Sequence, residues 1–135
     1  MRSVITTALG LILFSVLLIA SGQISEFHGT RQESSVVLEW STEYESSLKA
    51  FELQRSVDQT TWLKIGSVSA TGNSTDKTSY SFIDNSVYKS SEAIFYYQIV
   101  MIDQSGQRTV HDTVVSVSGS SGIRHTWCSI KATFR

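Results

Sequence analysis

The sequence predicts an all-β domain built from two packed sheets, and three observations support this prediction. Apolar and polar residues alternate along most of the body of the chain, which is the pattern of strands that bury one face. Polar, turn-forming stretches such as Ser56–Thr61 and Asp103–Gln107 separate the alternating runs. No segment between residues 23 and 117 keeps an apolar period of 3.6 over a useful length, so no helix is expected there.

Each expected strand corresponds to one alternating run. Seven short strands in about 95 residues are typical of a two-sheet sandwich of the immunoglobulin-like type. A five-stranded barrel is the weaker alternative, because it needs fewer strands. The runs are ISEFHGT (24–30), SVVLEWST (35–42), AFELQRS (50–56), TWLKIGSV (61–68), SYSFID (79–84), AIFYYQIVMID (93–103) and TVHDTVVSVS (109–118).

The alternation also indicates which side chains form the core. One face of each run gathers large apolar residues, and this face is expected to turn inward. The chain contains no proline, so charged residues, namely Lys49, Lys64 and Glu39, are expected to protect the edge strands. The expected core residues are Leu38, Trp40, Phe51, Leu53, Phe82, Tyr97 and Ile99.

Several runs resemble fibronectin type III-like domains. The stretches VVLEW, FELQRSVDQTTWLKIG, YSFIDN, FYYQIVMIDQSGQ and VVSV are similar to those domains in exported proteins of Bacteroidota bacteria, over about residues 24–117. Many proteins of that group end in a sorting domain for type IX secretion. The resemblance implies a fibronectin type III-like sandwich. It also implies that Trp40 is the buried tryptophan of the second strand, and that the hydroxyl of Tyr97 anchors the corner beside the sixth strand.

Residues 1–22 have the composition of a signal peptide. Arg2 precedes an uncharged run from Val4 to Ala20, and the small residues Ala20 and Gly22 have the spacing that signal peptidase accepts. Cleavage after Gly22 is expected. An uncleaved membrane anchor is the alternative, although the run is near the lower limit of about 17–25 residues and polar residues interrupt it. The chain is therefore expected to be exported to the periplasm, the cell surface or the medium.

Residues 118–135 differ from the body, residues 23–117. The body holds seven Lys/Arg and twelve Asp/Glu, a net charge of -5, whereas residues 118–135 carry three cations and no acid. With a helical period, the apolar residues of this tail share one face, behind a Ser/Gly hinge at 118–122. The tail is expected to dock on a protein partner or an anionic membrane surface, or else to fold back over an edge or end of the body. The residues expected to dock are Ile123, Arg124, Trp127, Ile130, Lys131, Phe134 and Arg135.

The sequence offers little that points to chemistry. An acidic body is a poor match for nucleic acid, which requires clustered cations. The three histidines do not have metal-ligand spacing, and no cofactor is expected. His111 and Asp112 are neighbours on an expected strand, where they would point to opposite faces and could not form part of a catalytic triad. Cys128 is the single cysteine, so it can link two chains or remain a free buried thiol. Asp84, Asp103 and Asp112 are interpreted as turn carboxylates rather than a calcium site.

These observations favour a non-enzymatic, exported interaction or adhesion module at the cell envelope, with the tail as its docking element. The alternative function is a carbohydrate-binding module, because such modules stack sugars on exposed aromatic side chains. The aromatic residues at or near loops that could serve this purpose are Tyr44, Trp62 and Tyr88.

Overall fold

The computed structural model describes residues 21–87 and 93–118, which form eight strands and no helix. The predicted all-β, fibronectin type III-like sandwich is confirmed. The predicted leader, the tail beyond Ser118 and Tyr88 lie outside the described residues. The strands are β1 (Gly22–Gln32), β2 (Ser35–Glu45), β3 (Leu48–Ser56), β4 (Leu63–Ser69), β5 (Thr78–Asp84), β6 (Ile94–Asp103), β7 (Arg108–Val110) and β8 (Val115–Ser118).

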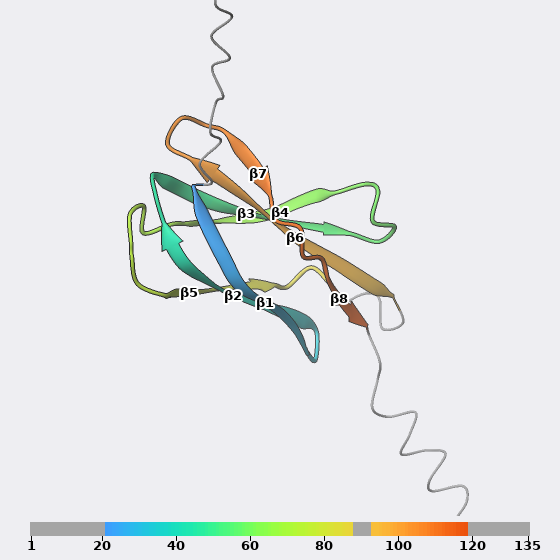
Figure 1. Ribbon diagram of the computed structural model, residues 1–135. Helices are drawn as coiled ribbons and strands as arrows, with labels where there is room; N and C mark the ends of the chain where they lie inside the picture. Colours follow the sequence, from blue (N-terminus) through green and yellow to red (C-terminus); the bar gives the residue numbers. More distant parts are fainter. Residues whose placement is uncertain (1–20, 88–92, 119–135) are drawn as a thin grey trace, which may run out of the picture.

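The strands pair into two antiparallel sheets that stack face to face (Figure 1). The smaller sheet has the order β1-β2-β5, and the larger has the order β4-β3-β6-β7, with β8 also paired to β6. Of the three charges expected to protect edges, only Lys64 lies on an edge strand, β4. Lys49 and Glu39 lie on the central strands β3 and β2, so that part of the prediction is wrong.

The last predicted strand, 109–118, is two strands. Val100 pairs with Val110 in β7, and Tyr97 pairs with Val115 in β8. An advance of three residues along β6 therefore corresponds to an advance of five residues along the segment that contains β7 and β8. The two extra residues are accommodated in the break between Val110 and Val115. Because an insertion of two residues preserves the alternation of faces, the sequence pattern could not reveal the break.

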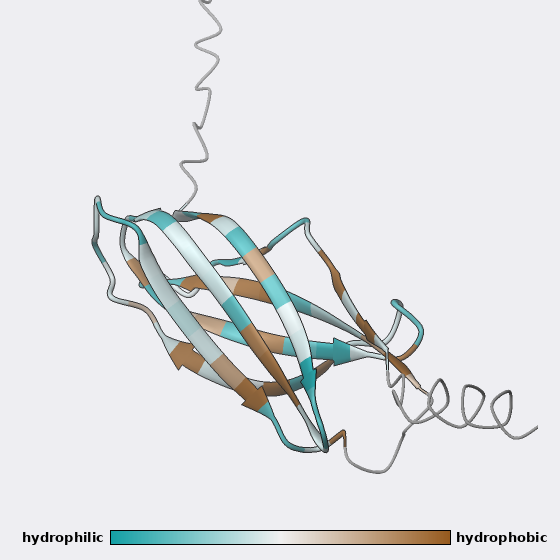
Figure 2. Cartoon of the chain, turned by 90° about the horizontal axis from the view of Figure 1, so that it is seen from below, coloured by the Kyte–Doolittle hydropathy of each residue, from teal (hydrophilic) through white to brown (hydrophobic). Residues whose placement is uncertain are grey.

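The core lies between the sheets and is filled by large side chains. Trp40 from the smaller sheet stacks on Tyr80, with ring centroids 5.6 Å apart, and meets the edge of Phe51 from the larger sheet at 5.4 Å. Figure 2 shows apolar and polar residues interleaved along the strands, as this two-faced packing requires. Phe82 is only half-buried, on edge strand β5. The other expected core residues are all buried: Leu38, Trp40, Phe51, Leu53, Tyr97 and Ile99.

The chain enters and leaves the sandwich at opposite ends (Figure 1). At the entry end, Gly22 pairs with Glu45, where β2 leads into β3. At the exit end, β3 finishes, β4 and β6 begin, and Ser118 of β8 pairs with Ile94. Within residues 21–87 and 93–118 there is no helix long and apolar enough to span a membrane.

Candidate functional site

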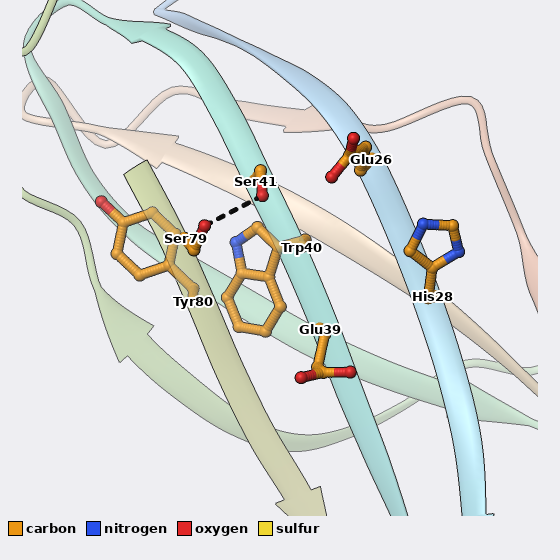
Figure 3. Close-up of a pocket in the computed structure, with 7 residues that line it drawn as sticks. All are labelled: Glu26, His28, Glu39, Trp40, Ser41, Ser79 and Tyr80. Carbon is orange, nitrogen blue, oxygen red and sulfur yellow. Dashed lines mark hydrogen bonds between the residues drawn. The ribbon is translucent and has the colours of Figure 1, made fainter. Parts of the chain in front are cut away.

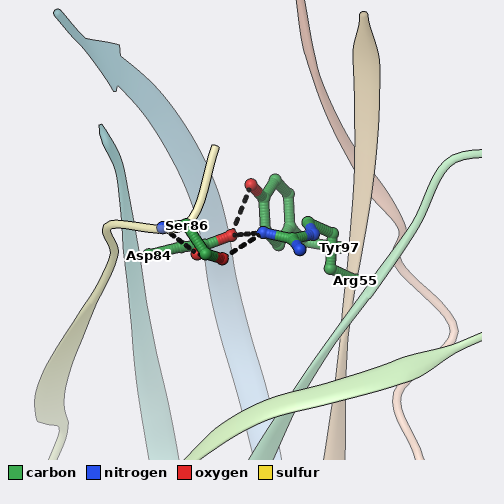
Figure 4. A network of polar contacts seen from close by, with 4 residues as sticks. All are labelled: Arg55, Asp84, Ser86 and Tyr97. Carbon is green, nitrogen blue, oxygen red and sulfur yellow. Dashed lines mark hydrogen bonds and ion pairs between the residues drawn. The ribbon is translucent and has the colours of Figure 1, made fainter. Parts of the chain in front are cut away.

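A buried polar cluster at the exit end joins the two sheets (Figure 4). Asp84 ends β5, and its Oδ2 accepts hydrogen bonds from Arg55 Nη1 at 2.7 Å and from the Tyr97 hydroxyl at 3.0 Å. Its Oδ1 accepts from the backbone N–H of Ser86 at 3.0 Å and from the hydroxyl of the same residue. Tyr97 therefore holds the corner after β5 through a side-chain carboxylate.

The surroundings of this cluster set its protonation. Burial is the main cause that raises the pKa of Tyr97 well above its ordinary range, and the negative charge of Asp84 acts in the same direction. Burial also acts to raise the pKa of Asp84, but the hydrogen bonds from Ser86 and Arg55 outweigh it, so this pKa is lowered. The cluster thus contains a carboxylate and a neutral phenol at neutral pH, and the phenol donates a hydrogen bond to the carboxylate.

A second buried carboxylate, Glu45, fastens the entry end. Its Oε1 accepts hydrogen bonds from Thr42 Oγ1 at 3.0 Å and from the hydroxyl of Tyr80, and its Oε2 accepts from the Gly72 N–H at 2.9 Å. Burial raises the pKa of Tyr80, and the hydrogen bond to Glu45 raises it further. Glu45 therefore ties the loop between β4 and β5 to the smaller sheet.

A third buried carboxylate, Glu52, lies on the outward face of the larger sheet. Arg108 of β7 donates two hydrogen bonds to it, at 2.7 and 3.2 Å, and Lys64 of β4 lies 3.4 Å away. Gln54 donates to Glu52 at 2.8 Å and accepts from Gln98 at 2.6 Å. The hydrogen bond from Arg108 is the main cause that lowers the pKa of Glu52 to about 2, against the opposing effect of burial. This ladder ties four strands together.

Sequence reasoning did not identify Glu52 or Arg108. Glu52 occupies the polar face of an alternating run, so the pattern predicts an exposed side chain. Its burial depends on a cation from β4, the next strand along the chain, and on a second from β7, which is distant in sequence. Only strand order and register bring these residues together, and neither can be read from spacing alone.

The outward face of the smaller sheet has a shallow polar depression of about 250 Å³ (Figure 3). Ser41 and Ser79 share a hydrogen bond of 3.2 Å at its centre, and Lys77 pairs with Glu26 at 3.1 Å. Carboxylate and hydroxyl oxygens therefore line part of a surface that is open to solvent, beside apolar area of the same depression. The lining residues are Glu26, His28, Glu39, Trp40, Ser41, Ser79 and Tyr80.

The depression offers polar groups for contact with a ligand. No hydrogen bond joins a serine hydroxyl to His28 in the part of the chain that the structure describes, so no activated nucleophile is formed there. In the same part of the chain, no group of three or more His, Cys, Asp or Glu side chains is arranged to hold a metal ion. A polar ligand or a cationic side chain of a partner would find acceptors here.

Tyr44 and Trp62, the two described aromatic residues that were expected to stack sugars, do not share a surface. Tyr44 is exposed near the end of β2, at the entry end of the smaller sheet. Trp62 is half-buried immediately before β4, at the exit end of the larger sheet. The length of β3 separates these positions, because β3 begins at one end and finishes at the other. A row of aromatics built from Tyr44 and Trp62 is therefore absent.

Two sequence interpretations need correction. His111 and Asp112 lie in the break between β7 and β8, where His111 Nδ1 approaches Asp112 Oδ1 to 3.5 Å, so they do not point to opposite faces. No hydrogen bond joins this pair to a serine within residues 21–87 and 93–118. Asp84 is buried at the exit end and is not a solvated turn residue, whereas Asp103 is paired with Leu48 at the entry end. Asp84 and Asp103 thus lie at opposite ends of the sandwich.

The comparisons with known proteins show the fold alone. The chain is similar to part of the pectate lyase Pel3 from Pectobacterium carotovorum, with 13% identity, a TM-score of 0.53, and coverage of 70% of this chain and 27% of that chain. It is also similar to part of a β-1,2-glucanase from Parabacteroides distasonis, with 14% identity, a TM-score of 0.54, and coverage of 74% and 13%. Neither a family model nor a curated protein matches the sequence.

Proposed function

We propose that this chain is a non-enzymatic interaction or adhesion module, exported to the cell envelope or surface. The proposal rests on the hydrogen bonds that the buried carboxylates of Asp84, Glu45 and Glu52 accept. Each is engaged by donors from neighbouring strands or loops, so each holds the framework rigid and is not available for acid–base chemistry. A rigid framework with polar outer faces suits a protein that presents a surface.

The size of the chain relative to its structural neighbours supports the same proposal. The fold corresponds to 27% and 13% of the two longer chains, as expected of a module that accompanies other domains. We further propose that the chain is related to the fibronectin type III-like domains of exported Bacteroidota proteins. Its partner is then a protein or an envelope surface, and the basic tail, residues 118–135, is the docking element. The single Cys128 provides a route to a disulfide-linked dimer.

Binding to envelope material with and without the tail tests this function. The chain purified after export is compared with a version that ends at Ser118, by co-sedimentation with envelope fractions. The same two proteins are mixed with vesicles of phosphatidylglycerol and of phosphatidylcholine. Loss of sedimentation on removal of the tail is expected, and binding only to the anionic vesicles would identify the membrane as the target.

Charge and apolar contributions of the tail are separated with two matched variants. One replaces Arg124, Lys131 and Arg135 by Gln, and the other replaces Trp127 and Phe134 by Ser. Loss of binding in the first alone indicates an electrostatic surface, and loss in the second indicates an apolar groove. Equal binding by all forms, including the chain that ends at Ser118, would contradict the role of the tail as a docking element.

Carbohydrate binding is the second candidate, and one observation favours it. The two solved structures described above as similar to this chain are, by name, a pectate lyase and a β-1,2-glucanase, which act on polysaccharides. Among residues 21–87 and 93–118, Tyr44 is the exposed aromatic side chain that could stack on a sugar, and it lies on β2, the strand that also lines the polar depression. Affinity electrophoresis in gels that contain polygalacturonate or β-1,2-glucan tests this candidate. Retardation that Tyr44→Ala abolishes would favour it over the interaction module.

A further inference from the structure

The exit end of the sandwich exposes a group of apolar side chains. Val57, Leu63 and Ile94 are 67%, 60% and 48% exposed, and Trp62 is half-buried next to Leu63. We call these four residues the exit-end patch.

The register places these side chains on neighbouring strands. Leu63 pairs with Arg55 near the end of β3, and Val57 directly follows Ser56, which pairs with Tyr96 of β6. Ile94 begins β6, two residues before Tyr96. Leu63 lies on the same face of the sheet as Arg55 and Tyr97, whereas Ile94 is three residues from Tyr97 along β6 and lies on the opposite face. The patch therefore wraps around the adjoining ends of β4, β3 and β6 and is not a single flat face. Single exposed apolar residues are normal on a protein, but a group of them indicates a surface that another element covers.

The path of the chain indicates what covers the patch. Ser118, the last residue of β8, pairs with Ile94, which is itself part of the patch. Residues 119–135 therefore start beside the patch. The few residues between Ser118 and Ile123 span about 15 Å when extended, which is enough to cross the end of a sheet. A segment tethered this closely has an effective concentration of about millimolar for its own domain.

The composition of residues 119–135 matches the exit end. Its apolar residues Ile123 and Trp127 can share one face, opposite Val57 and Leu63. Its three cations meet an acidic body, and the exposed carboxylate of Asp58 follows Val57. Lys64 follows Leu63, but its ammonium group is paired with Glu52 at 3.4 Å. The apolar residues and the net charges of the two segments are thus complementary.

We propose that residues 119–135 dock in cis on the exit-end patch, with Ile123 and Trp127 over Val57 and Leu63. The contact goes beyond the proposed function, because it gives the docking element a resting position on its own domain. A partner that recognises the tail then competes with the patch, and the apparent affinity for that partner is lowered by the fraction of chains with a docked tail.

The single cysteine provides a direct probe of this contact. Cys128 adjoins Trp127, so the rate at which its thiol reacts with a disulfide reagent reports how accessible the tail is. The chain purified after export is compared with a Val57→Ser/Leu63→Ser double variant. A Val110→Ser variant is the matched control, since Val110 is 56% exposed on β7, outside the patch. A synthetic peptide of residues 119–135 defines the rate for a free tail.

The expected result is a slow reaction of Cys128 in the parent chain and in Val110→Ser, and a reaction about tenfold faster in the double variant. Amide hydrogen exchange of residues 123–134 should change in the same direction, and it serves as the second readout if the thiol itself lies outside the contact. The proposal is supported if the parent chain shows slow thiol reaction or slow amide exchange and the double variant loses that protection.

Three results would overturn the proposal. In the first, the thiol reaction and the amide exchange of the parent chain are as fast as those of the free peptide. In the second, the double variant reacts and exchanges at the same rates as the parent chain. Protection that increases with protein concentration would assign the contact to a second copy of the chain, which contradicts docking in cis. None of these measurements involves a partner, so a failure of the proposed function in the sedimentation assay remains distinguishable from a failure here.

Discussion

At the scale of single residues, Asp84 joins the two sheets through side-chain hydrogen bonds. It lies on β5 of the smaller sheet, and it accepts hydrogen bonds from Arg55 and Tyr97 of the larger sheet. A buried carboxylate costs free energy unless donors surround it, and removal of the carboxylate leaves the buried donors without an acceptor. Mutation of the acceptor Asp84 and mutation of the donor Tyr97 should therefore lower the free energy of unfolding by different amounts.

Truncation of Asp84 should cost more than loss of the Tyr97 hydroxyl. Tyr97→Phe removes one donor and leaves Asp84 with Arg55 and Ser86, so we expect a loss of about 1–2 kcal/mol in the free energy of unfolding. Asp84→Ala leaves the largely buried guanidinium of Arg55 without its carboxylate, with only the Ser86 hydroxyl as acceptor, and leaves the buried phenol of Tyr97 without an acceptor, for which we expect about 3–5 kcal/mol. Urea denaturation of both variants measures the two losses.

The control for these variants is Tyr44→Phe, which removes a hydroxyl from an exposed tyrosine and should change stability by less than about 0.5 kcal/mol. The double variant Asp84→Ala/Tyr97→Phe should lose less than the sum of the single losses, because the phenol no longer needs an acceptor. Strict additivity would show that the hydrogen bond does not couple these residues.

Gly66 is a second residue whose identity is set by a close contact. A Cβ atom at this position would lie 2.4 Å from the ring of Phe82, which covers the space between the edge strands β4 and β5. We expect Gly66→Ala to cost about 1–3 kcal/mol, because the ring must move away. Thermal unfolding checks the value, and addition of Phe82→Leu should recover part of it by making room for the new methyl group.

Gly106→Ala is the contrasting substitution. Gly106 has a φ of +88° and no neighbour within 4 Å of a Cβ, so only backbone strain opposes a side chain there. We expect a loss of about 1 kcal/mol that Phe82→Leu does not reduce. Equal rescue of both glycine variants by Phe82→Leu would show that the Gly66–Phe82 contact is not the cause.

At the scale of strands, Glu52 links β3 to β4 and β7, and its protonation should set part of the acid stability. Its pKa falls from 4.5 to about 2 on folding. Since the folded value lies below the unfolded value, the contribution is fully present above about pH 4.5 and is lost as the pH falls toward 2. After allowance for solvent screening around the half-exposed Arg108, we expect this contribution to be about 1–2 kcal/mol.

The Arg108→Met variant measures this contribution. It should be less stable than the parent by about 1–2 kcal/mol at pH 7, and the difference should shrink toward zero near pH 2. Lys77→Met is the control, because the pair of Lys77 with Glu26 is exposed on both sides and should contribute less than about 1 kcal/mol at any pH. An Arg108→Met difference that persists unchanged at low pH would show that packing, and not the ion pair, is responsible.

The strands also show where sequence reasoning succeeds and where it fails. The alternating runs predicted the positions of β2, β3, β5 and β6, because one buried face imposes a period of two. The same period could not reveal the break between β7 and β8, where two inserted residues preserve the parity. It also assigned Glu52 to solvent, since alternation tells which face a residue is on but not what lies over that face.

At the scale of the whole molecule, the sandwich is closed along both sides by glycines that admit a neighbour's side chains. Gly66 admits Phe82 between β4 and β5, and Gly29 of β1 admits Val117 and Val115 of β8. The candidate site depends on the same assembly, because the polar depression combines β1, β2 and β5. No motif in the sequence marks this site, since its residues meet only after strand pairing. The fold class was therefore predictable, whereas the site was not.

The closure between β1 and β8 should matter for solubility as well as for stability. A Cβ at Gly29 would lie 2.7 Å from Val117 and 3.0 Å from Val115, so Gly29→Ala should push β8 away from β1. We expect a loss of about 1–3 kcal/mol in the free energy of unfolding. Because the chain has no proline to block the edge of β1, we also expect Gly29→Ala to self-associate through that edge.

Light scattering over a range of concentrations measures this association, and urea denaturation measures the stability. Thr30→Ala is the matched control, because Thr30 is the exposed neighbour on the same strand and its substitution leaves the contact with β8 intact. A Gly29→Ala protein that is destabilised but scatters light as the parent does would show that β1 is protected by features other than β8. In that event the charged residues along the smaller sheet, rather than its closure, would be what keeps the chain from pairing edge to edge.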